Sequence, residues 1–408
     1  LSWILMSLVG ALPFVFSGEI PNYIDAVFET VSGFTTTGAS IITDLEVMSH
    51  GILFWRSLSQ WIGGMGVLVF IMAVLPLSEE HSMHIMRAEV PGPQVGKLVP
   101  RVRASSAITY LIYVGLTAIL IILLCLGGMP VFDAFIHAMS AASTGGYGVH
   151  GLSIGYYDSA YIDVVTGIFM LLFGINFSIY FLLLMRKFRK VFTNSELLCY
   201  LGIVAFSVIT IAIDIGGIYD TFGSSLRYSF FQVSSIMTTT GFATADFGQW
   251  PVYSQFLLIL LMFIGACSGS TGGGIKVSRL ILLIKSSFGE FYRLINPRKI
   301  TSVTMDGLEV DDATLRSTQV FFSLYISITF VSCLLVSLDG YDITTNFSAV
   351  VACISNIGPG LGLVSPAGNY AFFSGFSKII LSLCMLIGRL EVYPMLMLAI
   401  PSVWRRKA

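Results

Sequence analysis

The sequence predicts an all-α polytopic membrane protein in which one structural unit occurs four times. Three observations support this fold class. Hydrophobic residues make up 55% of the 408 residues and charged residues only 11%, whereas soluble domains carry about a quarter charged residues. Several uncharged runs reach the roughly 20 residues that a membrane-spanning helix needs. A shorter apolar segment that ends in Thr, Ser and Gly recurs along the chain.

Five uncharged runs are long enough to span a bilayer, and two shorter runs are further candidates. The five cover residues 57–78, 104–132, 164–185, 247–275 and 317–338, and the shorter two cover 197–213 and 379–400. The chain opens in another apolar segment, Ser2 to Phe16, which would form only about 22 Å of helix. We therefore expect further sequence upstream. A cleaved signal peptide is the weaker interpretation, because no basic region precedes the segment.

Lysine and arginine residues predict which loops face the cytoplasm. They cluster in four places, at Arg87 to Arg103, Arg186 to Lys190, Lys276 to Lys285 and Arg405 to Lys407. Each cluster follows the second spanning run of a unit, and the positive-inside rule assigns all four to the cytoplasm. The opposite loops are mostly acidic, so we expect them to face outward.

The four short segments share one plan when they are aligned on a single glycine in each. Their sequences are DAVFETVSGFTTTGA at 25–39, DAFIHAMSAASTGGY at 133–147, YSFFQVSSIMTTTGF at 228–242 and TNFSAVVACISNIGP at 345–359. We call the aligned glycines the anchor glycines: Gly38, Gly146, Gly241 and Gly358. The spacing between copies leaves room for one spanning helix before and one after each segment.

Each short segment holds about 12 apolar residues, too few to cross a bilayer. Its polar end cannot face lipid, because every unpaired backbone group there would cost several kcal/mol. The segments must therefore re-enter the membrane from the outer face. The carboxyl end of each short helix would then direct its negative partial charge toward the membrane centre, which favours a cation. The Thr-Gly stretch behind it could expose carbonyl oxygens in a line, and four such stretches around one axis would form a filter.

The predicted filter consists of the three residues that end at each anchor glycine. They are Thr36, Thr37 and Gly38; Thr144, Gly145 and Gly146; Thr239, Thr240 and Gly241; and Asn356, Ile357 and Gly358. None of these stretches contains an acidic residue, so we expect a monovalent cation rather than a divalent one. Only the second stretch approaches the T-V-G-Y-G signature of potassium channels. Selectivity for potassium over sodium should therefore be weaker than in those channels. The alternative is that the Thr-Gly clusters are ordinary loop residues with no role in a filter. Four aligned copies disfavour this alternative.

The repeats and four longer motifs resemble the TrkH/KtrB superfamily of potassium transporters, on the TrkH side. The motifs are SGFTTTGAS at 32–40, RSLSQWIGGMGVLVF at 56–70, CSGSTGGGIKVSR at 267–279 and GRLEVYP at 388–394. The resemblance implies a pseudo-fourfold pore of four M1–P–M2 repeats in the bacterial inner membrane, with potassium as the transported ion. It further implies a homodimer and a cytosolic ring of nucleotide-binding regulatory subunits of the TrkA type. No organic cofactor, nucleic-acid partner or enzymatic activity is expected.

Glycines predict a break in the second helix of the third repeat. Five lie within residues 265–274, where each costs a helix about 1 kcal/mol. Broken backbone at mid-membrane depth must pack in protein or line a watery cavity. We therefore expect a movable plug below the filter, made of Gly269, Ser270, Thr271, Gly272, Gly273, Gly274 and Lys276. The alternative is a glycine-rich helix that crosses the membrane in close packing.

Arg389 is the second expected gating residue. It lies roughly 15 residues before the basic end of the chain, too deep to reach the interface comfortably. The resemblance implies that it projects into the pore below the filter, where its charge would raise the barrier for a cation by on the order of 2 kcal/mol. A salt bridge with Glu391 is the alternative, although residues two apart on a helix do not face each other.

The repeats divide the chain into six segments. They are repeat 1 at 1–78, with an incomplete first helix; a cytoplasmic linker at 79–103; repeat 2 at 104–190; repeat 3 at 191–285, with a broken second helix; a second linker at 286–315; and repeat 4 at 316–408. The leading functional prediction is a channel-like potassium uptake pore driven by the membrane potential. The alternative is a secondary transporter coupled to sodium or protons. Inverted repeats would favour the alternative, but these four copies share one orientation.

Overall fold

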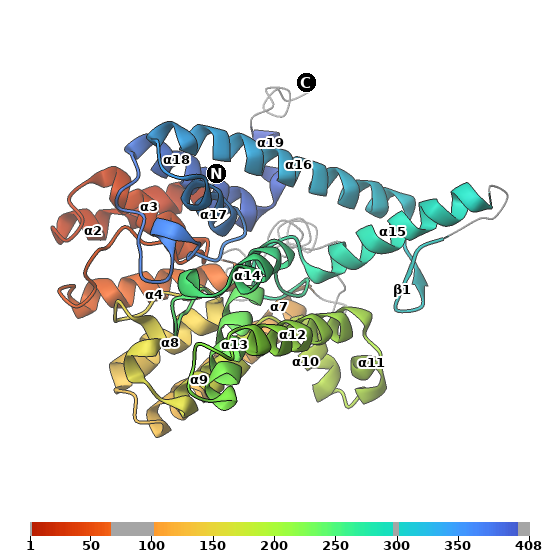
Figure 1. Cartoon of the computed structure of the whole chain (residues 1–408), viewed down its shortest axis with the longest axis horizontal. Coiled ribbons are helices and arrows are strands. Elements are labelled where there is room, and N and C mark those ends of the chain that lie inside the picture. Colours follow the sequence, from red (N-terminus) through yellow and green to blue (C-terminus); the bar gives the residue numbers. More distant parts are fainter. Residues whose placement is uncertain (1, 67–101, 297–301, 399–408) are drawn as a thin grey trace.

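The computed structural model describes residues 2–66, 102–296 and 302–398. Within these residues helices dominate, and the one sheet is a small antiparallel hairpin of β1 (Thr304–Met305) and β2 (Leu308–Glu309). The predicted all-α fold class is therefore confirmed. Figure 1 shows the chain passing around the molecule in sequence order, from the red N-terminal helices through yellow and green to the blue C-terminal ones.

The helices fall into four consecutive groups, and each group contains one of the repeated segments. The first contains α1 (Ser2–Gly10), α2 (Leu12–Phe16), α3 (Tyr23–Phe34) and α4 (His50–Gly64). The second contains α7 (Val102–Leu126), α8 (Val131–Ser143), α9 (Ala160–Phe173), α10 (Phe177–Leu184) and α11 (Phe188–Phe192). The third contains α12 (Ser195–Asp214), α13 (Phe222–Met237), α14 (Val252–Ile264) and α15 (Val277–Ile295). The fourth contains α16 (Asp312–Val336), α17 (Ile343–Ile354), α18 (Gly375–Leu390) and α19 (Val392–Leu398).

Short 3₁₀ helices lie in the connections of the second to fourth groups. They are η1 (Ser153–Tyr157), η2 (Phe247–Gln249), η3 (Ser337–Asp339) and η4 (Gly362–Val364). Each of the groups contains one short helix, α3, α8, α13 or α17, at the position of a repeated segment. Most of these four short helices begin at a side-chain cap: Asn22, Thr221 and Asp342 accept hydrogen bonds from backbone N–H groups of α3, α13 and α17, respectively.

Three described helices are long and apolar enough to cross a membrane. They are Ala107–Leu126, Ser195–Asp214 and Asp312–Asp339. The run at 197–213, predicted as a shorter candidate, thus belongs to a full-length helix. The second half of the run at 57–78, nearly all of the linker at 79–103 and the basic end of the chain lie outside the described residues.

The prediction of one continuous span at 164–185 is wrong. Helices α9 and α10 meet there at a bend of 92°. The first helix ends at Phe173 with Gly174 as its C-cap, and Asn176 caps the second, because its side chain accepts a hydrogen bond from the Ser178 N–H at 2.9 Å. Gly174 lies directly before the bend, and a side chain at this position would contact the Tyr200 hydroxyl. We call residues Gly174 to Phe177 the elbow.

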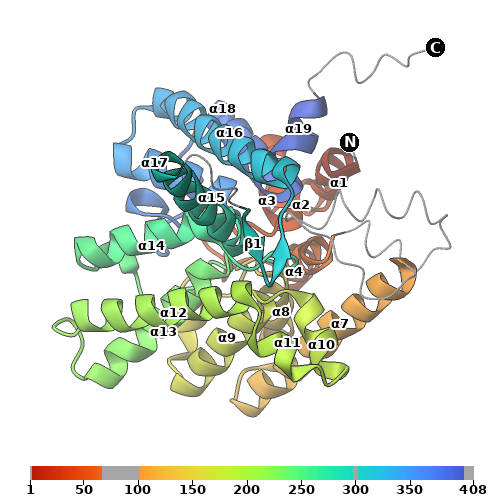
Figure 2. The same cartoon turned by 90° about the vertical axis from the view of Figure 1, so that its right-hand side faces the viewer.

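Helix α14 ends at Ile264 and α15 begins at Val277, so the glycine-rich residues between them are not helical. We call residues 265–276 the glycine loop. Helix α15 continues to Ile295, past the boundary expected at 285, and it projects from the body of the molecule beside the hairpin (Figure 1). In Figure 2 this projecting helix points toward the viewer. The hairpin is attached to the start of α12, because Asp306 accepts a hydrogen bond from the Ser195 N–H at 2.7 Å.

The helix contacts close into a ring. The helix that follows each short helix packs against the short helix of the next group: α4 against α8, α9 against α13, and α14 against α17. Helix α18 of the fourth group packs against α3 of the first and completes the circuit. An ion pair of Lys378 on α18 with Asp25 on α3 joins the same two helices at 2.7 Å.

We expect Asp25→Asn to destabilise the protein by about 2 kcal/mol or more, because it leaves the largely buried Lys378 ammonium without its carboxylate. Thermal unfolding of the purified protein in detergent measures the effect. The double variant Asp25→Asn with Lys378→Met should recover most of the loss, since it removes both charges. Equal stability of the wild type and Asp25→Asn would contradict a structural role for the pair.

Candidate functional site

The four short helices end in one backbone motif. The residue two positions before each anchor glycine has a left-handed conformation, with φ of 54° at Thr36, 56° at Thr144, 59° at Thr239 and 56° at Asn356. The following residue donates its N–H to a carbonyl five positions back, at 2.8–2.9 Å in every copy. This is the Schellman arrangement that terminates helices. The identical geometry explains why the repeated sequences align on their glycines.

Left-handed backbone turns each stretch back from its helix. The anchor glycines have φ of 80°, 79°, 83° and 93°, which glycine adopts readily. At Thr36, Thr144 and Thr239 the same conformation costs roughly 1–2 kcal/mol each, because these residues carry a Cβ. Residues of positive φ alternate with residues of negative φ between Thr36 and Gly38.

The four stretches meet in a closed ring. A Cβ added to Gly38 would strike the carbonyl oxygen of Gly145, and one added to Gly146 would strike that of Thr240. A Cβ on Gly241 would strike the carbonyl oxygen of Ile357, and one on Gly358 would lie 2.7 Å from that of Thr37. Each anchor glycine therefore touches the carbonyl of the next stretch, and the fourth touches the first. The structure brings all twelve expected filter residues together.

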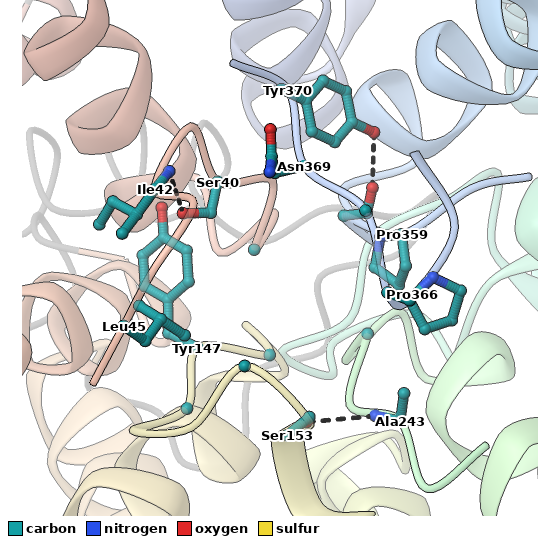
Figure 3. A pocket seen from close by; sticks show the side chains of 18 of the residues that line it. Ser40, Ile42, Leu45, Tyr147, Ser153, Ala243, Pro359, Pro366, Asn369 and Tyr370 are labelled. Carbon is teal, nitrogen blue, oxygen red and sulfur yellow. Dashed lines mark hydrogen bonds between the residues drawn. The ribbon is translucent and has the colours of Figure 1, made fainter. Parts of the chain in front are cut away.

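The ring forms the floor of an outer cavity. This cavity has a volume of about 150 Å³, and all four anchor glycines line it. Figure 3 shows segments from four parts of the chain around it, with Tyr147, Ala243 and Pro359 on different sides. Glu46 lies close to its rim, where a hydrogen bond from the Gly151 backbone N–H holds the pKa of the carboxyl below its ordinary value. The rim therefore keeps a negative charge, which attracts cations.

Gln60 on α4 braces the second stretch, and sequence reasoning missed it. Its amide nitrogen donates to the Gly145 carbonyl at 2.6 Å. Its amide oxygen accepts from the Ser140 hydroxyl at 2.5 Å and from the Tyr147 N–H at 3.3 Å. Gln60 is fully buried. A glutamine inside an otherwise apolar run was the signal available in the sequence.

A buried ion pair supports the ring behind the first stretch. Glu29 on α3 and Arg56 on α4 lie 2.8 Å apart, and both side chains are almost completely buried. The guanidinium lies 4.0 Å from the centre of the Tyr147 ring, and the Tyr147 hydroxyl donates to the Glu29 carbonyl at 2.9 Å. The pair thus ties the first two repeats together.

The fourth stretch differs from the others because Asn356 replaces threonine. Its side-chain nitrogen donates to the Thr37 hydroxyl and to the Met385 carbonyl, both at 2.9 Å. Asn356 therefore links the fourth stretch to the first and to α18. Asparagine also tolerates the left-handed conformation better than threonine does.

The glycine loop lies against the carboxyl ends of the short helices, on the side of the ring opposite the outer cavity. A Cβ on Gly272 would meet the Thr238 carbonyl oxygen, and one on Gly273 would meet that of Ser355. The Gly273 N–H donates to the Thr239 hydroxyl at 2.6 Å. The fully buried Lys276 donates through its Nζ to the Gly272 carbonyl. Of the expected plug residues, Gly272 and Gly273 therefore lie against the ring-bearing helices, whereas Gly269 lies against Asn176 of the elbow.

Arg389 makes contacts that the sequence did not predict. Its guanidinium donates to the Thr271 carbonyl at 2.7 Å and to the carbonyls of Gly63 and Gly64, each at 2.6 Å. The side chain thus holds the glycine loop to the end of α4. Glu391, the alternative partner considered from sequence, forms an ion pair with Arg279 at 2.7 Å.

Comparisons with known proteins agree along almost the whole chain. A model of the TrkH family, described as a cation transport protein, matches residues 1–406. The Trk system potassium uptake protein TrkH of Salmonella typhimurium is 40% identical over 99% of this chain and 84% of its own length. The TrkG protein of Escherichia coli is 38% identical over the same shares. The crystal structure of the potassium transporter TrkH from Vibrio parahaemolyticus superimposes with a TM-score of 0.88, at 33% identity, over 99% of this chain and 84% of that one.

We expect Gly241→Ala to lower cation flux in proteoliposomes at least tenfold, because its methyl group would strike the Ile357 carbonyl and spoil the ring. Gly340→Ala is the matched control, since Gly340 has φ of 82° but open space around its Cβ position. Backbone strain is therefore similar in the two variants. Equal flux in both variants would show that the contact between stretches is unimportant.

Proposed function

The chain belongs to the TrkH family of cation transport proteins, and from this premise we propose that it takes up potassium through the ring of anchor glycines. Membership confirms the resemblance seen in the motifs, and it identifies a multi-pass membrane transporter of the bacterial inner membrane rather than an enzyme. Relatives from several bacteria are named as potassium uptake proteins of the Trk system. The observation that carries the proposal is the closed contact of each anchor glycine with the next stretch.

The ring suits a dehydrated monovalent cation. Backbone carbonyls and threonine hydroxyls from Thr36 to Gly38 and their counterparts would replace the water around the ion. The short helices direct their carboxyl ends toward the space below the ring, and their partial negative charge favours a cation there. The described stretches contain no carboxylate, which fits potassium better than a divalent ion.

Selectivity for potassium over sodium should be moderate. The four stretches carry three different residue types at the position before the anchor glycine: threonine at Thr37 and Thr240, Gly145 and Ile357. Gln60 also holds the Gly145 carbonyl, so the four carbonyls do not have equal surroundings. Four carbonyl groups in unequal surroundings form a less regular ring around the ion than four carbonyl groups from identical subunits would.

We propose that the glycine loop is the gate. The loop contacts the backbone carbonyls of Thr238 and Ser355 and the hydroxyl of Thr239. These contacts support a position in the ion path below the ring. Arg389 would hold the loop closed through Thr271. Its charge would also oppose a cation that has passed the ring.

We further propose that the protein acts as a homodimer with cytosolic regulatory subunits of the TrkA type. The end of α15 projects from the body (Figure 1) and exposes large apolar side chains, among them Phe288, Phe291 and Leu294. An exposed apolar surface of this kind supports contact with another subunit.

Proteoliposomes with defined ion gradients test the transport proposal. A potassium gradient alone should drive current, and the reversal potential should favour potassium over sodium. A reversal potential that follows the sodium gradient would contradict the assigned selectivity. Potassium flux that requires an opposing sodium or proton gradient would instead establish the coupled secondary transporter.

Two changes should open the gate. Deletion of residues 268–274 should raise potassium flux because it removes the plug, and Arg389→Ala should raise flux on the order of tenfold, since it removes both a tie to the loop and an opposing charge. Flux measurements on purified, monodisperse variants provide the comparison. Arg293→Ala, which removes an exposed arginine paired with Glu290, is the control. Unchanged flux in a folded deletion variant would eliminate the plug.

A further inference from the structure

A single buried carboxylate binds both ends of the glycine loop to a neighbouring helix. Glu196 lies in the first turn of α12 and is 5% exposed. Its Oε1 atom accepts hydrogen bonds from the Ser268 N–H at 2.6 Å and from the Ser278 N–H at 3.2 Å. Ser268 stands near the start of the loop and Ser278 just beyond its end. Both ends of the loop therefore donate a backbone hydrogen bond to the same oxygen atom of a neighbouring helix.

The broken helix explains why a carboxylate is needed there. The first N–H groups of a helix have no partner within it. Lys276 occupies the N-cap position of α15 and makes no capping hydrogen bond with its side chain. Glu196 supplies the missing acceptor from α12, and its negative charge is favourable near a helix N-terminus. Hydrogen bonds to an ionised group are also stronger than those between neutral groups.

The elbow of repeat 2 holds the same part of the loop from another side. The Cys267 N–H donates to the Gly174 carbonyl at 3.0 Å, and the Phe177 N–H donates to the Gly269 carbonyl at 3.1 Å. These neutral backbone bonds fix residues on either side of Ser268. They do not involve Ser278, just beyond the end of the loop. Backbone bonds join the two ends to each other, since the Lys276 N–H donates to the Ile264 carbonyl at 2.8 Å and the Val277 N–H to the Ala266 carbonyl at 3.1 Å. Glu196 binds this closed base of the loop to α12.

We propose that Glu196 is the positioning residue that keeps the glycine loop in its closed place below the ring. This inference rests on the proposed gate. A movement of the whole loop away from α12 would break its hydrogen bonds to the carboxylate. Neutralising the carboxylate weakens both bonds and shifts the loop toward the open position.

Potassium flux and cysteine labelling of the full-length chain in liposomes test the role of Glu196. Glu196→Gln keeps the shape and an acceptor oxygen but loses the charge, and it should raise flux about tenfold, equivalent to about 1.4 kcal/mol. Cys267 is a native probe in the loop and is fully buried. Its labelling by a maleimide, measured on the Cys267 peptide by mass spectrometry, should accelerate by a similar factor.

Asp163→Asn is the matched control. It also neutralises a buried carboxylate, but Asp163 binds Arg227 away from the glycine loop. This variant should leave both flux and Cys267 labelling unchanged. Adding Glu196→Gln to the deletion of 268–274 should give no further increase in flux.

The outcomes separate this inference from the gate proposal. Higher flux in the loop deletion but wild-type flux and labelling in Glu196→Gln would overturn the role of Glu196 and leave the gate intact. Wild-type flux in the deletion and faster labelling in Glu196→Gln would preserve the positioning role and remove the gate. Failure of Glu196→Gln to fold, with Asp163→Asn folded, would also contradict the inference, because a carboxylate that only positions a loop is dispensable for the rest of the fold.

Discussion

The structure depends on one constraint, that backbone N–H and C=O groups inside a membrane must find partners within the protein. Four short helices end at this depth, and each ends in the same Schellman arrangement. The two breaks in longer helices are paired with one another, since the elbow and the glycine loop exchange backbone hydrogen bonds. Gln60 and Arg389 donate hydrogen bonds to further backbone carbonyls, and Glu196 accepts one from a backbone N–H. These three polar side chains therefore mark places where the backbone departs from helix or a helix ends.

Close approach of backbone segments forms the layer beneath the ring. Gly63 lies against the Phe34 carbonyl, Gly273 against that of Ser355, and Gly388 against that of Ile354. These glycines come from α4, the glycine loop and α18, and each meets the carboxyl end of a short helix. Side chains at these positions would separate the layers. The arrangement keeps the glycine loop within hydrogen-bonding distance of the helices that carry the ring.

Sequence reasoning predicted the parts of this fold that depend on local pattern. The alignment on Gly38 and its counterparts succeeded because each copy needs the same left-handed backbone. The bend at Gly174 was not predicted, because one glycine and one asparagine do not interrupt an apolar run by themselves. Contacts between residues distant along the chain, such as Glu196 with Ser278 or Arg389 with Gly63, also could not be predicted from the sequence. Their pairing follows from how the repeats pack, which no local spacing encodes.

The four stretches belong to one polypeptide, and this has a consequence for how the ring can change. In an assembly of identical subunits, one codon change alters every quadrant at once. Here a mutation alters one quadrant and leaves three untouched. Asn356 and the glycine loop are such departures, each confined to a single repeat. Covalent linkage therefore lets one quadrant acquire an element of its own, such as the glycine loop, while the other three keep their shape.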